Sequence, residues 1–104
     1  MQSSDNAMVQ IGSDVNFTCV TNEDRSIRWE KHSGHANKFD VVFNGEKITT
    51  HFESRYSVAF SKFGSQFRFQ LSIRSVNPDD AGFYACSETW RNLRHIAELN
   101  VFCK

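Results

Sequence analysis

The sequence predicts an all-β protein, an antiparallel sandwich of two packed sheets. Two observations carry this prediction. Apolar and polar residues alternate with a period of two in several short segments, and turn signals rich in Gly, Asn, Asp and Ser separate those segments. No segment shows a convincing helical period. The length of 104 residues fits one domain with a single hydrophobic core.

The alternation is clearest in three segments, residues 15–21, 56–61 and 67–74. Each places apolar side chains on one face and mostly polar or small side chains on the other, which is typical of a half-buried strand. The apolar sides comprise Val15, Phe17 and Cys19 in the first segment, Tyr56, Val58 and Phe60 in the second, and Phe67, Phe69, Leu71 and Ile73 in the third.

Turn residues lie between these predicted strands. Residues 12–14 precede the first strand, residues 62–65 join the second to the third, and residues 77–80 form a predicted loop. Asn44-Gly45 is a strong hairpin signal because both residues tolerate a positive φ. Many short strands joined by such turns predict an antiparallel sandwich.

Composition and motifs exclude several functions. The formal net charge is zero and the pI is about 6.9, so there is no basic excess of the kind that binds nucleic acid. No serine elbow or paired-carboxylate motif is present, so we expect no enzyme and no cofactor. The four histidines lack the spacing of metal ligands and are interpreted as surface residues. They are His32, His35, His51 and His95.

Cysteine usage indicates an oxidising compartment. Cys19 and Cys86 are 67 residues apart, and a long-range pair in a small Phe-rich domain is typical of a structural disulfide. Asn16 begins an Asn-x-Thr sequon and is a candidate glycosylation site. Cys103 leaves an odd count, which suggests either an intermolecular disulfide or an unpaired stalk cysteine. No apolar run of 18 residues and no signal peptide occur, so we expect a mature ectodomain fragment.

Three further features identify a family resemblance. Trp29 follows Cys19 by ten residues, residues 80–86 match Asp-x-Gly-x-Tyr-x-Cys, and Arg55 precedes Asp80 by 25 residues. Over nearly its whole length the chain resembles the V-set of the immunoglobulin superfamily. The resemblance implies a V-type Greek-key sandwich over residues 1–102, with residues 103–104 beginning a stalk.

The same resemblance assigns structural roles. It implies a Cys19–Cys86 disulfide with Trp29 packed against it. It also implies a tyrosine corner at Tyr84 and an Arg55–Asp80 ion pair at one end of the sandwich. Residues 39–50 would supply the additional strands C′ and C″ of variable-type domains.

One departure from the family pattern narrows the choice among its members. Rearranged antigen-receptor domains carry Phe-Gly-x-Gly in the last strand, whereas residues 94–99 here contain no glycine. This argues against an antibody or a T-cell receptor chain. Residues 27–43 and 82–102 are similar to the alpha chains of T-cell co-receptors for class I MHC molecules, in the Trp, the Gly-containing turn, the Phe-led strand and the Val-Phe ending.

That similarity implies an extracellular receptor domain on the plasma membrane that dimerises and binds class I MHC. A V-set receptor or cell-adhesion domain with another protein ligand, and a monomeric structural module of a longer protein, are the alternatives. Loops at one end would bind the ligand. The candidate loop residues are Arg25, Ser26, Asn44, Gly45, Trp90, Arg91, Asn92 and Arg94. For Trp90 the alternative is packing on the sandwich edge.

The predicted dimer surface is the outer face of the sheet that contains strands C, C′, F and G. Ala85 and Ser87 have the opposite parity to Tyr84 and Cys86, so we expect them to face outward and form a small-residue floor. The other residues predicted to lie on this dimer surface are Glu30, His32 and Phe39. The partner would be a second copy or a related chain, and the alternative is a monomer with a hydrated face.

Overall fold

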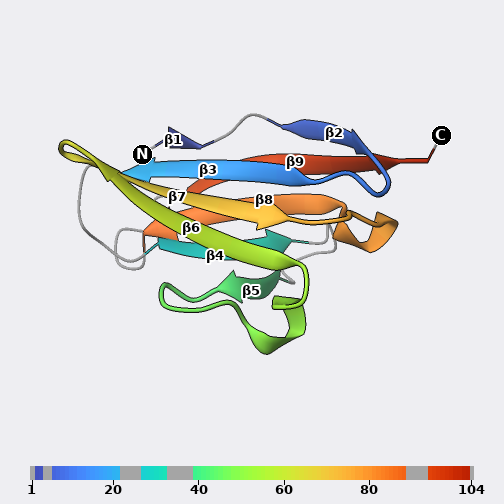
Figure 1. Ribbon diagram of the computed structural model, residues 1–104, viewed down its shortest axis with the longest axis horizontal. Coiled ribbons are helices and arrows are strands. Elements are labelled where there is room, and N and C mark those ends of the chain that lie inside the picture. Colours follow the sequence, from blue (N-terminus) through green and yellow to red (C-terminus); the bar gives the residue numbers. More distant parts are fainter. Residues whose placement is uncertain (1, 4–5, 22–26, 33–38, 89–93, 104) are drawn as a thin grey trace.

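The computed structural model describes residues 2–3, 6–21, 27–32, 39–88 and 94–103 (Figure 1). Within these residues it contains nine β-strands and two short 3₁₀ turns. In chain order they are β1 (Gln2–Ser3), β2 (Ala7–Gln10), β3 (Val15–Thr21), β4 (Ile27–His32), β5 (Phe39–Phe43), η1 (Thr50–Phe52), β6 (Tyr56–Phe63), β7 (Gln66–Ile73), η2 (Pro78–Asp80), β8 (Gly82–Glu88) and β9 (Arg94–Phe102). No helix among them is long and apolar enough to cross a membrane.

The strands form two sheets. One has the order β1-β3-β7-β6 and the other the order β2-β9-β8-β4-β5. All neighbouring pairs are antiparallel except β2 and β9. Because β3 and β4 follow each other in the chain but lie in different sheets, the connections cross the sandwich as a Greek key requires. The predicted all-β V-type sandwich is therefore confirmed.

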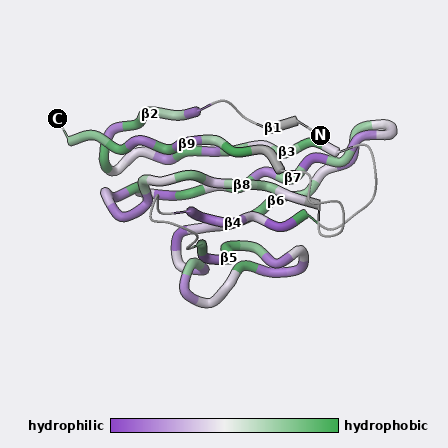
Figure 2. Tube along the Cα trace, turned by 180° about the vertical axis from the view of Figure 1, so that it is seen from behind, coloured by the Kyte–Doolittle hydropathy of each residue, from purple (hydrophilic) through white to green (hydrophobic). Residues whose placement is uncertain are grey.

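The three segments with clear alternation are strands β3, β6 and β7. In β3 the side chains of Val15, Phe17 and Cys19 are buried, and those between them are exposed or partly exposed. In β7, Phe69 through Ile73 show the same period. Figure 2 shows this alternation as bands of hydrophobic and hydrophilic residues along the strands. The apolar sides of both sheets face each other and form one core.

Residues 39–50 differ from the expected pair of strands C′ and C″. Only β5 is a strand, and the segment after it makes a single isolated bridge from Phe43 to Ile48. The cause is local: the Asn44 side chain accepts hydrogen bonds from the backbone N–H groups of Glu46 and Lys47, at 2.9 and 3.1 Å. These bonds close a tight turn, with only Gly45 at positive φ, and η1 follows directly. The prediction of a C″ strand was wrong.

Residues 77–80, predicted as a loop, contain the 3₁₀ turn η2. Asn77 caps it, because its side chain accepts from the backbone N–H of Asp79 while its own N–H donates to the Asp80 carboxylate, both at 2.9 Å. Gly82 follows at φ 149°, and a Cβ there would lie 2.9 Å from the carbonyl oxygen of His32. The glycine of the Asp-x-Gly-x-Tyr-x-Cys motif is therefore required by the close approach of β8 to β4.

Candidate functional site

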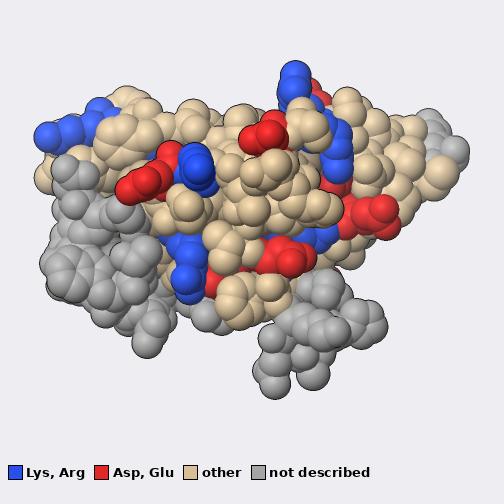
Figure 3. Space-filling view, turned by 90° about the horizontal axis from the view of Figure 1, so that it is seen from below, with Lys and Arg blue, Asp and Glu red and all other residues tan. Residues whose placement is uncertain are grey.

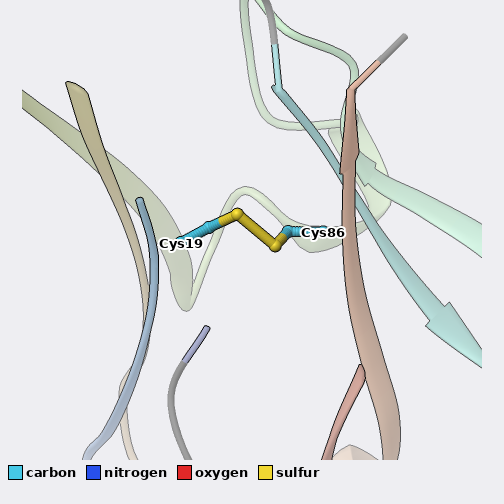
Figure 4. The surroundings of a disulfide bond; sticks show 2 residues. All are labelled: Cys19 and Cys86. Carbon is cyan, nitrogen blue, oxygen red and sulfur yellow. A yellow bond between two sulfur atoms is a disulfide. The ribbon is translucent and has the colours of Figure 1, made fainter. Parts of the chain in front are cut away.

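The centre of the sandwich is held by one covalent link. Cys19 of β3 and Cys86 of β8 form a disulfide that joins the two sheets, with Cα atoms 6.5 Å apart (Figure 4). Trp29 lies directly opposite Cys86 in the β4–β8 ladder and is 1% exposed. The expected disulfide is confirmed.

A buried polar network closes one end of the sandwich. Arg55 donates to both carboxylate oxygens of Asp80, through Nη1 at 2.6 Å and Nη2 at 2.9 Å. The Tyr56 hydroxyl donates to the same carboxylate at 2.6 Å. The Tyr84 hydroxyl donates to the backbone carbonyl of Asp80, also at 2.6 Å, which is the expected tyrosine corner. The ion pair predicted from sequence is therefore bidentate and hydrogen-bonded on several sides.

The network sets the protonation of its members. Burial alone would raise the pKa of the Asp80 carboxyl, but hydrogen bonds from Arg55, Tyr56 and the Asn77 backbone outweigh burial and hold that pKa below its ordinary value. Burial raises the pKa of both Tyr56 and Tyr84, which keeps their hydroxyls protonated as donors. The network therefore has a structural role, since it holds one end of the sandwich together.

A pocket of about 250 Å³ opens beside this network. Its lysine and its arginine are already engaged, since Arg55 binds Asp80 and the Lys31 ammonium donates to the backbone carbonyl of Asp79. Burial lowers the pKa of Lys31, although the aspartates nearby act in the opposite sense. In the described part of the chain, no group of His, Cys, Asp and Glu could hold a metal ion. The pocket therefore gives no reason to assign a ligand.

The outer face of the five-stranded sheet carries the exposed apolar side chains. We call it the apolar face. In β8 and β9 the residues that alternate with the buried Tyr84, Cys86, Ala97 and Leu99 point outward. Of the eight exposed large hydrophobic side chains among the described residues, five lie on this face. They are Met8, Phe39, Phe83, Ile96 and Phe102.

The ladder places these side chains in adjacent rows. One row runs from Phe39 through His32 to Phe83, and the imidazole of His32 stacks on Phe39 with ring centroids 5.3 Å apart. The next row runs through Glu30 and Ala85 to Ile96, which is 54% exposed. The face therefore presents aromatic and aliphatic groups around a central pair of small or acidic residues.

The predicted dimer-face residues lie on this face, but not all are accessible. Phe39 is 47% exposed, whereas Glu30 and Ala85 have no exposed surface and Ser87 has 4%. The Glu30 carboxylate lies beneath two neighbouring side chains, since Arg28 is 2.7 Å and His32 3.3 Å from it. The expectation of a small-residue floor open to a partner needs this correction, because the floor lies beneath the surface.

Sequence reasoning missed four members of the apolar face, Met8, Phe83, Ile96 and Phe102. The signal was present, since Phe83 shares the parity of Ala85 in the same strand. Ala85 and Ser87 are small, but the larger side chains beside them supply the accessible surface.

The predicted ligand-binding loops are only partly described. Arg25, Ser26, Trp90, Arg91 and Asn92 lie outside the described residues, and Arg94 is described only as the first residue of β9. Asn44 and Gly45 form a turn at the end of the molecule where β3 and β8 also end (Figure 1).

Two further candidates are exposed. Cys103 is a free cysteine just beyond β9. Asn16 lies on β3 and points away from the core, on the outer face of the four-stranded sheet. Both remain candidates for modification.

Known proteins support this architecture. The immunoglobulin V-set domain family matches residues 2–102. A rabbit (Oryctolagus cuniculus) protein, Ig kappa chain V region 3368, is 27% identical over 94 residues, which cover 88% of this chain and 80% of that protein.

Two solved structures resemble the fold. The RIG-5 IG1 homodimer structure superposes with a TM-score of 0.77 at 21% identity and covers 94% of this chain and 90% of that one. The second Ig domain of the mouse polymeric immunoglobulin receptor gives 0.78 at 19% identity, with 96% and 97% covered. Such domains are non-catalytic binding modules, typical of cell-surface and extracellular proteins. Residues 2–102 span nearly the whole chain, and this protein therefore belongs to the immunoglobulin V-set domain family.

Proposed function

We propose that this protein is the ligand-binding domain of a cell-surface immune receptor and that it dimerises through its apolar face. One observation carries the proposal: five of the eight exposed large hydrophobic side chains gather on the outer face of one sheet. Exposed apolar residues scattered singly need no explanation, but a gathered set marks an interaction surface.

The composition of the face fits a protein interface. Phe39, Phe83 and Ile96 provide an apolar centre, and the partly exposed Arg28 and Glu98 border it. Protein interfaces commonly combine an apolar, aromatic-rich core with a polar rim. The buried Glu30 adds order to this centre, because it fixes the side chains of Arg28 and His32 in place before a partner binds.

A second copy of the chain is the partner we favour. A twofold dimer brings the same patch of each subunit together, so a largely apolar patch complements itself. The similarity to an Ig domain solved as a homodimer is consistent with this choice. A related chain with a similar face would form a heterodimer by the same contacts.

For the ligand we propose a class I MHC molecule, on the resemblance of this chain to T-cell co-receptor alpha chains. Arg25, Arg91 and Arg94 would bind an acidic loop of the ligand through charge-assisted hydrogen bonds. Trp90 would add an aromatic anchor, and Asn44 and Gly45 a second contact.

The alternative is a V-set receptor or adhesion domain with a different protein ligand. The fold similarity to a domain of the polymeric immunoglobulin receptor and to a homodimeric Ig domain is as compatible with this alternative as with the class I MHC hypothesis. In both cases the apolar face and the loops at one end are the surfaces in use.

Surface plasmon resonance against class I MHC separates the two. We expect binding that weakens about thirtyfold or more when Trp90 or Arg91 is changed to Ala, since hot spots in interfaces have effects of this size. Unchanged affinity in both variants would remove these residues from the site. No binding by the unmutated domain would favour the alternative, and a screen against V-set ligands would follow.

A further inference from the structure

Among the described strands, β6 has the longest edge. The two sheets end in four edge strands, β1 with two residues, β2 with four, β5 with five and β6 with eight. The outer edge of β5 is partly covered, because Ile48 bridges Phe43 and the Thr49 N–H donates to the Val42 carbonyl at 2.8 Å. Among the described strands only β7 pairs with β6. Long edges are places where another chain can add.

Every second residue of β6 has backbone hydrogen-bonding groups that point toward the outer edge, where another strand could pair with them. The Arg74 N–H donates to the Arg55 carbonyl at 3.0 Å, and the register with β7 then continues without a bulge to the hairpin turn. Hydrogen-bonded and non-bonded pairs alternate along an antiparallel ladder. The residues whose N–H and C=O groups point away from β7 are therefore Tyr56, Val58, Phe60 and Lys62.

Aromatic side chains lie beside this edge. Phe60 is 54% and Phe63 57% exposed. The ring of Phe60 lies 5.9 Å from that of Phe67 and 5.1 Å from that of Phe69, so it forms the outer margin of a Phe cluster. No proline and no bulge interrupts β6, and Lys62 is its single charged residue. The edge thus lacks most of the features, such as prolines, bulges and several charges, that prevent edge strands from pairing with other chains.

Basic residues lie along β6 and β7 toward the hairpin tip. Residues 54–78 contain four basic residues and no acidic residue, and one of the four, Arg55, is paired with Asp80. The other three are Lys62, Arg68 and Arg74. Two of the four sit on the Phe rings at the hairpin tip: Lys62 Nζ lies 5.4 Å from the ring of Phe67 and Arg68 Cζ 4.8 Å from that of Phe63. Figure 3 shows basic atoms at this end of the molecule. An acidic partner would complement this charge, whereas a second copy would repel it.

We propose that the outer edge of β6 binds an extended, acidic and apolar segment of a partner protein, which adds to the four-stranded sheet as a further strand. Backbone groups of Val58, Phe60 and Lys62 would pair with the segment. Its apolar side chains would pack beside Phe60, and its acidic side chains, which point to the opposite face of the sheet, would lie beside Ser61 and face Arg68. This surface lies on the other sheet from the apolar face and is independent of the proposed dimer.

The probe is a short fluorescent peptide that alternates Val and Glu, with a matched peptide that alternates Val and Lys. We expect the whole chain to bind the Val–Glu peptide at least about tenfold more tightly, as judged by fluorescence anisotropy. In K62E/R68E the preference should reverse. Equal binding of both peptides, or an unchanged preference in K62E/R68E, would overturn the proposal.

A second pair of variants tests the backbone. The Val58 N–H points outward, so Val58→Pro removes a bond to the incoming strand without removing one to β7. Val58→Ala is the matched control for the lost side chain. We expect the proline variant to bind the Val–Glu peptide about tenfold more weakly than the alanine variant. Equal affinities in two folded variants would exclude strand addition here, and the charge swap decides the question if the proline variant does not fold. Ile96→Arg should bind the peptide normally.

Discussion

The two outer faces of the sandwich differ although both sheets obey the same alternation. The outer face of the five-stranded sheet presents Phe39, Phe83 and Ile96 to solvent. Its counterpart on the four-stranded sheet, here called the polar face, is built mostly from hydroxyl, amide and basic side chains. These are Asn16 and Thr18 on β3, Ser57 and Ser61 on β6, and Arg68, Gln70 and Ser72 on β7.

The inward-facing side chains of both sheets form the common core. The outward-facing side chains make the two outer faces different. Leu71 and Leu99 are buried equally in the two sheets and contribute to the same core. The core would fold with a polar residue at position 96, which is 54% exposed. The apolar residues retained on one outer face are therefore better explained by a partner than by stability.

The largest expected effect concerns the link between the faces. Replacing Cys19 and Cys86 together by Ala should lower the free energy of unfolding by about 4 kcal/mol, because a loop of this length loses its closure in the unfolded chain. Denaturation in urea measures the change. Variants in which only one cysteine is replaced control for mispairing with the free Cys103. A loss below about 1 kcal/mol would mean that packing around Trp29 alone holds the sheets together.

The next effect is electrostatic. Asp80→Asn should destabilise the fold by about 2–3 kcal/mol near neutral pH, because the buried Asp80 carboxylate is lost and the partly exposed guanidinium of Arg55 loses its charged partner. The folded pKa of Asp80 is depressed below the ordinary value of 3.8. Its stabilising contribution is thus complete above about pH 5, and it is lost as the pH falls through the ordinary value towards the folded pKa.

The measurement is therefore a pair of pH profiles. The difference in unfolding free energy between the unmutated protein and Asp80→Asn should shrink as the pH falls below about 4. Tyr56→Phe, which removes one of the donors to Asp80, should show a smaller difference in the same direction. A gap that is constant from neutral to acid pH would show that the carboxylate does not stabilise through its charge.

Features of the fold and the site that are encoded by a local motif or by a period could be predicted from the sequence. The disulfide, the Arg55–Asp80 pair and the tyrosine corner could be predicted because a spaced motif encodes each of them. Strands β3 and β7 could be predicted because burial on one face imposes a period of two.

Other features could not be predicted, since they arise from neighbours in space. The missing C″ strand follows from the side-chain bonds of Asn44, which compete with strand formation. The burial of Glu30 depends on the side chains of Arg28 and His32, which lie against its carboxylate, and Ala85 is buried opposite Glu30 in the ladder. That β6 is a free edge follows from the order of strands in the sheet and from no property of its own sequence.

The comparison of the two faces has a direct test. Ile96→Arg places a charge at the exposed centre of the apolar face and should weaken self-association about tenfold or more. Gln70→Arg places the same charge on the polar face and is the matched control. Sedimentation velocity measures association, and both variants should keep their stability within about 0.5 kcal/mol. If both variants associate like the unmutated protein, or if that protein is monomeric at high concentration, the apolar face is not a dimer interface. Ala85, which is fully buried, is a poorer position for this test.

The smallest effect is expected for a sugar on the polar face. Asn16 points to solvent near the start of β3, and its side chain faces away from both the core and the apolar face. A bulky glycan is tolerated at a surface that no partner covers. We therefore expect the protein secreted from eukaryotic cells to carry one glycan that Asn16→Gln removes, as seen by mass spectrometry before and after glycosidase treatment. Removal should change stability by less than about 0.5 kcal/mol and leave dimerisation unchanged. If the glycan abolished dimerisation instead, the polar face would have to lie in or beside the interface, and the assignment of partner binding to the other sheet would fail.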